Sequence, residues 1–131
     1  MQDNFKIEII TPEKIIFSED VIMTTLPSYE GDMSILKDHI SIITFLRPGI
    51  IKTNKKEDNP DNFFVQDGTV EYFNNNLVVL SSSAINIKDI SKDFLENLSS
   101  DISKKLLDKN ITDHDRYILN HKIETIKEIR V

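Results

Sequence analysis

The chain has 131 residues, enough for one substantial hydrophobic core and a smaller appendage but not for two large cores. Its net charge of −6 argues against a nucleic acid partner, because binding to phosphates relies on clustered Lys and Arg side chains. The absence of Cys excludes disulfides and thiolate metal sites, and no apolar run approaches the roughly 20 residues that span a bilayer. Because the first residues also lack the pattern of a signal peptide, we expect a soluble, cytoplasmic protein without direct membrane insertion.

From Phe5 to about Ile87 the sequence carries the patterns of short β-strands. Phe5, Ile7 and Ile9 alternate with charged residues, as on a strand with one buried face. Many short strands without an amphipathic helix between them are typical of antiparallel sandwiches and barrels. The pattern therefore predicts an antiparallel β-sandwich of about ten strands. Besides the first, the expected strands cover residues 14–17, 20–26, 32–35, 40–45, 49–53, 63–66, 69–73, 77–80 and 84–87.

The breaks between these strands have the residues of tight turns. Pro48-Gly49 is typical of a type II turn, while residues 67–68 (Asp-Gly) and 74–76 (three Asn) are expected at positive φ in hairpins. Such turns connect neighbouring antiparallel strands. The segment 55–62 is polar and contains a proline, so we expect an exposed loop there.

After residue 87 the apolar period changes from two residues to four. Asp89 or Ser91 can cap the N-terminus of a first helix, and Thr112 opens a second helix with a capping box. The short connection makes the two helices an antiparallel hairpin. We therefore expect two domains, the β-sandwich at 1–88 and the helical hairpin at 89–131. The side chains that form the apolar stripe of the first helix are Ile90, Phe94, Leu98, Ile102 and Leu106.

The hairpin is close to the size limit for independent folding. It has roughly 40 residues and one narrow apolar seam, and chains of that size seldom fold without support. It therefore needs a surface to pack against, either the sandwich or a partner protein. Since the two placements of such small helices differ by on the order of a few kcal/mol, we expect the hairpin to be able to move.

The sequence carries no pattern for catalysis, cofactor binding or metal binding. Its glycines are far apart, unlike those of a phosphate-binding loop, and the serines at 81–83 lack the flanking glycines of a hydrolase elbow. We expect those serines at a strand end and turn. His114 and His121 are seven residues apart, which does not fit a helical metal site, so we interpret both as solvated surface residues. The carboxylates at 19–20 are expected as solvated charge in a turn.

Six segments carry motifs in a recognisable order. In the first, a strand and a polar stretch lead to a Phe (ITPEKIIF, 10–17), and in the second Glu-Gly-Asp is followed by a His (LPSYEGDMSILKDH, 26–39). The others are RPGIIK at 47–52, GTVE at 68–71, VVLSSSA at 78–84 and IKEIRV at 126–131. The ordered set resembles the epsilon subunits of F-type ATP synthases over essentially the whole chain.

The resemblance implies a peripheral rotor subunit without an active site, at the cytoplasmic face of the inner membrane of a bacterium. Its sandwich would bind the gamma subunit and the ring of membrane c subunits. For the ring, it implies contacts from Asp32, Leu36, Asp38 and His39. For gamma, it implies one face of the sandwich, with Thr11 and Thr44 as contact positions.

Residues at the expected ring contact depart from the family pattern. Lys37 and Asp38 stand where family members commonly have Pro-Gly before the histidine, His39, which changes the turn. Charged residues in an exposed loop can pair with basic loops of a partner. Solvated loop charge is the alternative interpretation of Asp32 and Asp38.

The helices depart from the family pattern as well. The ATP-binding motif of some family members is degraded at Ile90, Ser91 and Phe94, without its Asp and Arg, so we expect no bound ATP or other cofactor. The charges of residues 111–131 cancel. Inhibition of hydrolysis through a contact with the beta subunit is therefore not favoured, although the resemblance allows it.

The alternative function is a free-standing β-sandwich module that binds a peptide or a sugar. Such a module needs an exposed aromatic platform. The candidate residues are Tyr29, Tyr72 and Phe73, which we interpret as residues of turns and core.

Overall fold

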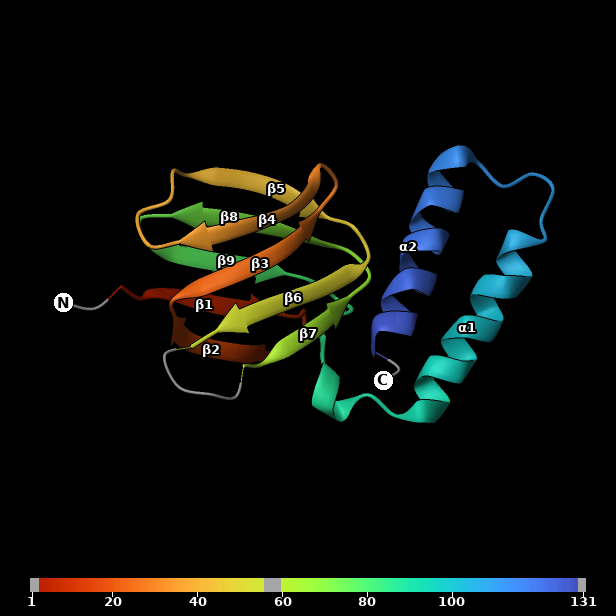
Figure 1. Ribbon diagram of the computed structural model, residues 1–131, viewed down its shortest axis with the longest axis horizontal. Helices are drawn as coiled ribbons and strands as arrows, with labels where there is room; N and C mark the ends of the chain where they lie inside the picture. Colours follow the sequence, from red (N-terminus) through yellow and green to blue (C-terminus); the bar gives the residue numbers. More distant parts are fainter. Residues whose placement is uncertain (1–2, 56–59, 130–131) are drawn as a thin grey trace.

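The computed structural model describes residues 3–55 and 60–129 of the protein. In these residues ten strands are followed by a short 3-10 helix, η1 (Ile87–Asp89), and two α-helices, α1 (Lys92–Leu106) and α2 (Asp113–Ile129). Figure 1 shows the strands gathered into one body and the two helices beside it. The strands are β1 (Phe5–Ile10), β2 (Ile15–Val21), β3 (Met23–Ser28), β4 (Gly31–Leu36), β5 (Ile42–Leu46), β6 (Gly49–Asn54), β7 (Asn62–Val65), β8 (Gly68–Phe73), β9 (Asn76–Leu80) and β10 (Ile85–Asn86).

The strands form one sheet that curls back on itself as a β-sandwich. Its order is β10-β7-β6-β3-β5-β8-β9-β1-β2, with β4 paired to β3. Strand β3 joins the two layers, because it pairs with β4 and β6 in one layer and meets β5 of the other only at Ser28 and Leu46. The pairs are antiparallel except β1 with β9. The predicted antiparallel sandwich of about ten strands is therefore confirmed, with one parallel pair that the sequence does not reveal.

The sandwich core is built by the alternation seen in the sequence. Phe5, Ile7 and Ile9 of β1 are at most 2% exposed. The ring of Phe5 meets that of Tyr72 edge to face, with centroids 5.6 Å apart. Each large apolar side chain that is fully buried contributes about 1.5–3 kcal/mol, so this core supplies most of the stability.

One of the turn predictions is confirmed and two are wrong. Asn74 and Asn75 have positive φ of 50° and 60°, as expected for a hairpin turn. Gly49 and the residues at 67–68 do not have positive φ. Gly49 is needed for close packing instead, because a Cβ there would lie 2.5 Å from the Cβ of Pro27.

Strand β2 is longer than the sequence suggests. It continues to Val21, which pairs with Phe5, so Glu19 and Asp20 lie in a strand and not in a turn. Pairing along the whole of β1 extends β2. The backbone N–H and C=O groups of β1 supply the hydrogen bonds that the backbone at Glu19 and Asp20 needs, although both side chains are polar.

The expected loop at 55–62 is only partly confirmed. Residues 56–59 lie outside the described residues, and Asn62 already belongs to β7. The side chains of Lys55 and Asp61 are 24% and 19% exposed, so both ends of the segment are half-buried and not solvated.

The helices begin where the sequence predicts. The Oγ of Ser91 accepts a hydrogen bond from the N–H of Phe94 at 3.0 Å, whereas Asp89 lies in η1, so Ser91 is the cap of α1. Thr112 Oγ1 accepts a bond from the N–H of Asp115 at 3.0 Å, which confirms the second cap. The buried side chains of the seam between the helices are Leu95, Ile102, Leu119 and Ile126.

The hairpin stands next to the sandwich, with α2 between the sandwich and α1 (Figure 1). Contacts come from the β3–β4 turn and from β6, where Lys52 Nζ lies 3.2 Å from Glu128 Oε1. Among the described residues, the sandwich core and the hairpin seam share no side chain. Neither helix, as far as it is described, has the length and apolar character required to span a membrane.

Candidate functional site

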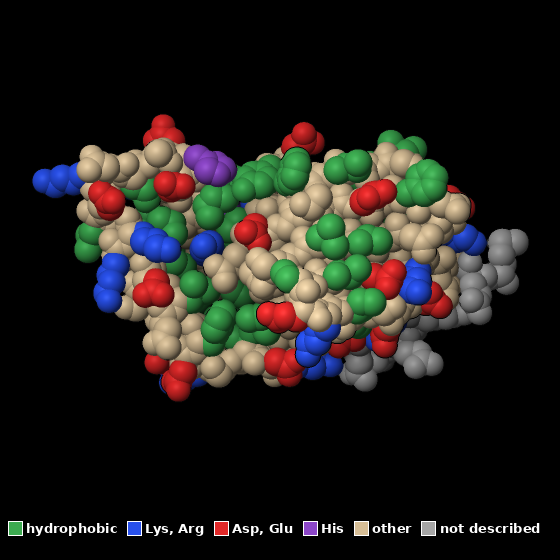
Figure 2. All heavy atoms as spheres, turned by 180° about the vertical axis from the view of Figure 1, so that it is seen from behind, with side chains coloured by type: hydrophobic (Ala, Val, Ile, Leu, Met, Phe, Trp, Pro, Cys, Tyr) green, Lys and Arg blue, Asp and Glu red, His purple; other side chains and the backbone are tan. Residues whose placement is uncertain are grey.

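Large apolar side chains are exposed on the outer face of the layer formed by β5, β8, β9 and β1. Ile43 is 72% exposed, Phe45 62% and Leu80 51%. Seen from behind, the sandwich carries open hydrophobic side chains interspersed with acidic ones (Figure 2). Single exposed apolar residues are ordinary, but a contiguous group of them marks a contact surface.

The strand register aligns these side chains in rows across the sheet. Phe45 lies opposite Thr69, Thr69 opposite Leu80, and Leu80 beside Ile10. We call these four residues the apolar row. The next row along the strands consists of Ile43, Glu71, Val78 and Glu8. Its two carboxylates therefore lie beside the apolar row.

A hollow of about 800 Å³ runs along the apolar row. All four residues of the row line it, together with Tyr29 and Asp67. Asp67 is exposed, and neither it nor Glu8 nor Glu71 forms an ion pair with another described residue. The surface is therefore apolar along its centre and acidic at its margins.

The two predicted gamma-contact residues lie near this surface but do not form it. Thr11 lines the hollow, and its Oγ1 donates to the backbone oxygen of Lys14 at 3.1 Å. Thr44 pairs with the buried Val70, so it shares the inner face. Its neighbours Ile43 and Phe45 are the exposed ones. The available signal is that β5 carries apolar residues on both sides of its alternation, interrupted only by Thr44, which indicates a strand with two apolar faces.

The four predicted ring-contact residues lie at the two ends of β4. Asp32 is near its start, next to α2, where its carboxylate accepts a bond from Arg47 Nη2 at 3.0 Å. Leu36 ends the strand four residues later, which at the rise of an extended strand is about 13 Å away. Asp38 and His39 follow β4 at that end (Figure 1). The structure therefore brings Leu36, Asp38 and His39 together and separates Asp32 from them.

The loop after β4 is fixed by Asn75. Asp38 has a φ of 65°, and its N–H donates to Asn75 Oδ1 at 2.7 Å, while Asn75 Nδ2 donates to Asp38 Oδ1 at 3.0 Å. The hydroxyl of Tyr72 donates to the same Oδ1 at 2.8 Å, and the ring of His39 meets Tyr72 edge-on. These bonds stabilise the turn formed by Lys37 and Asp38. Ile40 follows it and is 77% exposed.

The contact between α2 and the sandwich is aromatic and polar. The ring of Tyr29 stacks with those of His114 and Tyr117, at centroid distances of 6.2 and 6.0 Å. Thr125 is buried, and its hydroxyl donates within the helix to the backbone oxygen of His121. Exposed charge pairs and stacked rings contribute little compared with a packed core, so these two features alone hold α2 only weakly.

His121 is half-buried at this contact, so its interpretation as a solvated residue is wrong. Burial and the charge of Arg47 lower its pKa below the ordinary value, while Glu124 and Asp32 act in the opposite direction. His114 is exposed, as expected. Both rings face the sandwich, but His121 lies beside Asp32 and Arg47 and is more deeply covered, which the sequence of one helix cannot show.

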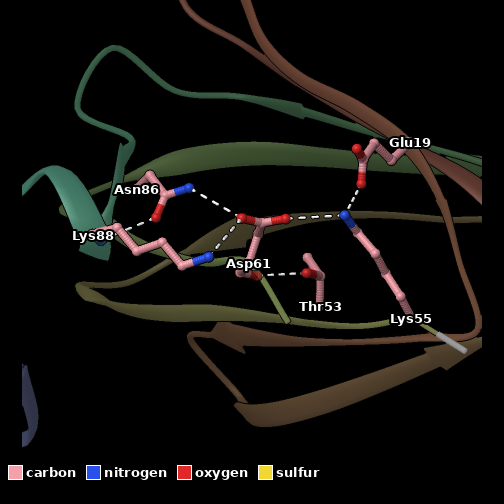
Figure 3. Close-up of polar contacts among 6 residues, drawn as sticks. All are labelled: Glu19, Thr53, Lys55, Asp61, Asn86 and Lys88. Carbon is pink, nitrogen blue, oxygen red and sulfur yellow. Dashed lines mark hydrogen bonds and ion pairs between the residues drawn. The ribbon is translucent and has the colours of Figure 1, made fainter. Parts of the chain in front are cut away.

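A charged cluster lies where the sandwich leads into the hairpin (Figure 3). The carboxylate of Asp61 accepts hydrogen bonds from Lys55 Nζ at 3.0 Å and Asn86 Nδ2 at 3.3 Å, and Lys88 Nζ lies 3.7 Å away. Lys55 also pairs with Glu19 of β2. Burial alone would raise the pKa of Asp61, but the bonds from Lys55 and Asn86 and the two lysine charges lower it. The cluster therefore ties the segment before β7 to β2 and to η1.

The serine run has a structural role. Ser81 is buried, and its Oγ donates to the backbone oxygen of Asp67 at 2.8 Å, while Ser83 Oγ accepts from the N–H of Gln66 at 2.9 Å. Since β9 ends at Leu80, the prediction of a strand end and turn is confirmed.

The three candidate aromatic residues do not form a platform. Tyr72 is buried in the core and Tyr29 stacks against α2. Phe73 is 63% exposed but ends β8 at the opposite end of the sandwich from Tyr29. The alternative of a sugar-binding module therefore lacks its expected site in the described part of the chain.

Comparison with known proteins identifies the family. A family model described as the ATP synthase Delta/Epsilon chain beta-sandwich domain matches residues 4–87, more than half of the chain. The ATP synthase epsilon chain of Pelagibacter ubique is 49% identical over 130 residues, which cover 98% of this chain and 99% of that relative.

Solved structures resemble the fold over nearly the whole chain. A chain of the Euglena gracilis mitochondrial ATP synthase, from a structure of its OSCP, F1 and c-ring, has a TM-score of 0.75 at 16% identity and covers 99% of this chain and 81% of that one. A chain from the central stalk and c-ring of the Tetrahymena thermophila mitochondrial ATP synthase has a TM-score of 0.65 at 17% identity, covering 95% and 92%. At such identities these two show the fold alone. The family model and the bacterial relative show more: this chain belongs to the family of ATP synthase epsilon chains.

Proposed function

We propose that this chain is a non-catalytic rotor subunit of a bacterial F-type ATP synthase, which couples the gamma subunit to the c-ring. Family membership supports the proposal, and the two similar solved chains come from assemblies that include a c-ring. The observation that carries it is the exposed apolar face with Ile43, Phe45 and Leu80, because such a surface suits a lasting protein partner.

One outer face and one end of the sandwich suit two partners. We assign gamma to the outer face of β5, β8, β9 and β1, with Thr11 at its margin. We assign the c-ring to the far end, where Leu36 is 55% exposed and Asp38 and His39 follow. Asp32 would reach the same partner only if that partner extended along the whole of β4.

The proposed subunit is peripheral, at the cytoplasmic face of the inner membrane, and has no catalytic group of its own. We propose that it binds no ATP, since Ile90, Ser91 and Phe94 offer no guanidinium to a phosphate at the start of α1. The hairpin is then a separate domain whose contact with the beta subunit, if formed, modulates hydrolysis only.

The test is reconstitution of the full chain with its gamma subunit and with membranes depleted of the epsilon chain. We expect a stable one-to-one complex with gamma and recovery of ATP-driven proton pumping. A chain truncated after residue 88 should retain ATP synthesis and change only hydrolysis. Failure of the full chain to bind gamma, or loss of coupling on removal of the hairpin alone, would contradict the proposal.

A further inference from the structure

The apolar row crosses the middle of a sheet face and does not follow a free strand edge. Strands β8, β9 and β1 are paired on both sides, whereas β5 meets β3 only through Leu46 and Ser28. A strand added beside β5 would leave Leu80 and Ile10 uncovered, so a partner that covers the whole row has to lay side chains onto the face itself. The hairpin does not cover the row, because α2 contacts the sandwich through β6 and the β3–β4 turn.

The dimensions of the row match one face of an α-helix. The row crosses four strands spaced about 4.8 Å apart, so it is about 14 Å long. Helical residues three or four apart are about 5–6 Å from each other, close to the strand spacing, and about ten residues of helix span the row. Successive side chains of one helical stripe would therefore meet Phe45, Leu80 and Ile10 in turn.

The charges around the row specify the flanks of that helix. Glu71 and Glu8 lie one row away, about 7 Å along the strands, and Asp67 lines the hollow on the other side. None of the three has an ion-pair partner among the described residues. A cationic flank would supply those partners, whereas a second copy of this chain, with its net charge of −6, would be repelled.

We propose that the apolar row binds an amphipathic helix of a partner protein, with an apolar stripe about ten residues long and Lys or Arg on both flanks. The inference rests on the proposed function, under which this helix belongs to gamma. The preference for an apolar stripe with cationic flanks can, however, be tested without gamma.

The probe is a pair of synthetic helical peptides with the same Leu stripe, one flanked by Lys and one by Glu, titrated into the full isotope-labelled chain. We expect amide shifts along the apolar row, and binding of the Lys peptide at least about tenfold tighter at low ionic strength, with the difference fading in high salt. Phe45→Ser and Leu80→Ser should weaken it about tenfold or more. The control Phe73→Ser, equally exposed but outside the row, should change affinity less than about twofold.

Two further substitutions test the preference for cationic flanks. Glu71→Gln with Glu8→Gln should remove most of the preference for Lys flanks and leave the effect of the Leu stripe. Equal binding of the two peptides, shifts elsewhere, or shifts that grow with protein concentration alone, as in a dimer, would overturn the inference.

The gamma subunit separates this inference from the proposed function. If the Lys peptide binds the row but gamma does not bind the chain, the proposed function fails and the inference stands. If gamma binds equally well to the chain with Phe45→Ser and Leu80→Ser, the inference fails and the proposed function stands.

Discussion

The sandwich and the hairpin bury their apolar side chains to different degrees. Tyr72, Phe63 and Ile7 in the sandwich are at most 1% exposed, whereas Leu95 and Leu119 in the hairpin seam are each 6% exposed and most of their neighbours are half-buried. Because burial energy follows the apolar area removed from water, the sandwich core contributes more to stability than the hairpin seam does. The hairpin is therefore an appendage, held by its seam, by Tyr29 and by the cluster around Asp61.

The largest effect is expected in the sandwich core. Phe63 packs against Phe17, with ring centroids 5.0 Å apart, so Phe63→Ala should cost about 3–5 kcal/mol of unfolding free energy by leaving a cavity. Denaturant unfolding of the full chain measures this. Phe73→Ala, at an exposed position, should stay within about 0.5 kcal/mol. Similar losses in both variants would mean that the core is not where the stability lies.

A smaller and more local effect is expected in the hairpin seam. Ile102→Ala should cost about 2–4 kcal/mol, but only for the hairpin, since Ile102 is buried between the two helices and touches no core residue of the sandwich. Amide exchange should therefore rise in α1 and α2 while β1, β8 and β9 stay protected. Leu107→Ala, 81% exposed, is the matched control. Faster exchange throughout the sandwich would break the distinction between the two regions.

The Asp61 cluster tests how the sandwich anchors the linker. Asp61→Asn removes the charge that holds Lys55 and Lys88, and should cost about 1–3 kcal/mol. The pKa of Asp61 is lower in the folded chain, so its contribution to stability is present above the ordinary Asp pKa of about 3.9 and is lost as pH falls through the lowered pKa.

The measurement for Asp61 is unfolding free energy against pH for the wild-type chain and the variant. The two curves should converge in acid. Asp101→Asn, at an exposed position in the middle of α1, is the matched control and should leave the curve parallel to that of the wild type. If the curve of Asp61→Asn stays parallel to that of the wild type down to low pH, the charge of Asp61 does not anchor the linker.

The smallest effect concerns the contact between α2 and the sandwich. The pKa of His121 is lowered there, chiefly by burial and then by Arg47, so the docked hairpin disfavours the protonated ring. Docking is then strongest above the ordinary His pKa of about 6.5 and weakens as pH falls below it. Signals of the Tyr29 ring, observed by NMR across this range, report the loss of stacking.

Because the ring of His114 stacks on Tyr29, the comparison is made in a chain that carries His114→Gln. There, His121→Gln should remove the pH dependence, and the control His39→Gln, whose ring contacts Tyr72 at the far end of the sandwich, should leave it in place. If the Tyr29 signals change with pH equally in both variants, another group governs the contact.

Much of the fold could be predicted from the sequence because it depends on patterns within a few neighbouring residues. The alternation in β1, the Asn turn at 74–75 and the caps Ser91 and Thr112 all act within a few residues, and the structure confirms them. The error at Gly49 has a tertiary cause: the glycine makes room for Pro27, which lies on a different strand.

The site was harder to predict than the fold. Sequence motifs led to Thr11 and Thr44, but the register of β5, β8, β9 and β1 selects Phe45 and Leu80 as the exposed residues. A shift by one residue would reverse the two faces of a strand, and the sequence of one strand alone does not fix that register.

By itself, the sequence determined the order of strands and helices, the change in the spacing of apolar residues from two to four, and the family. Only the tertiary structure decided that Asp32 is separated from Leu36, that Asp61 gathers two lysines, and that the apolar row lies open. The physical reason is that patterns report contacts between near neighbours along the chain, while these features depend on pairings between strands and helices far apart in it.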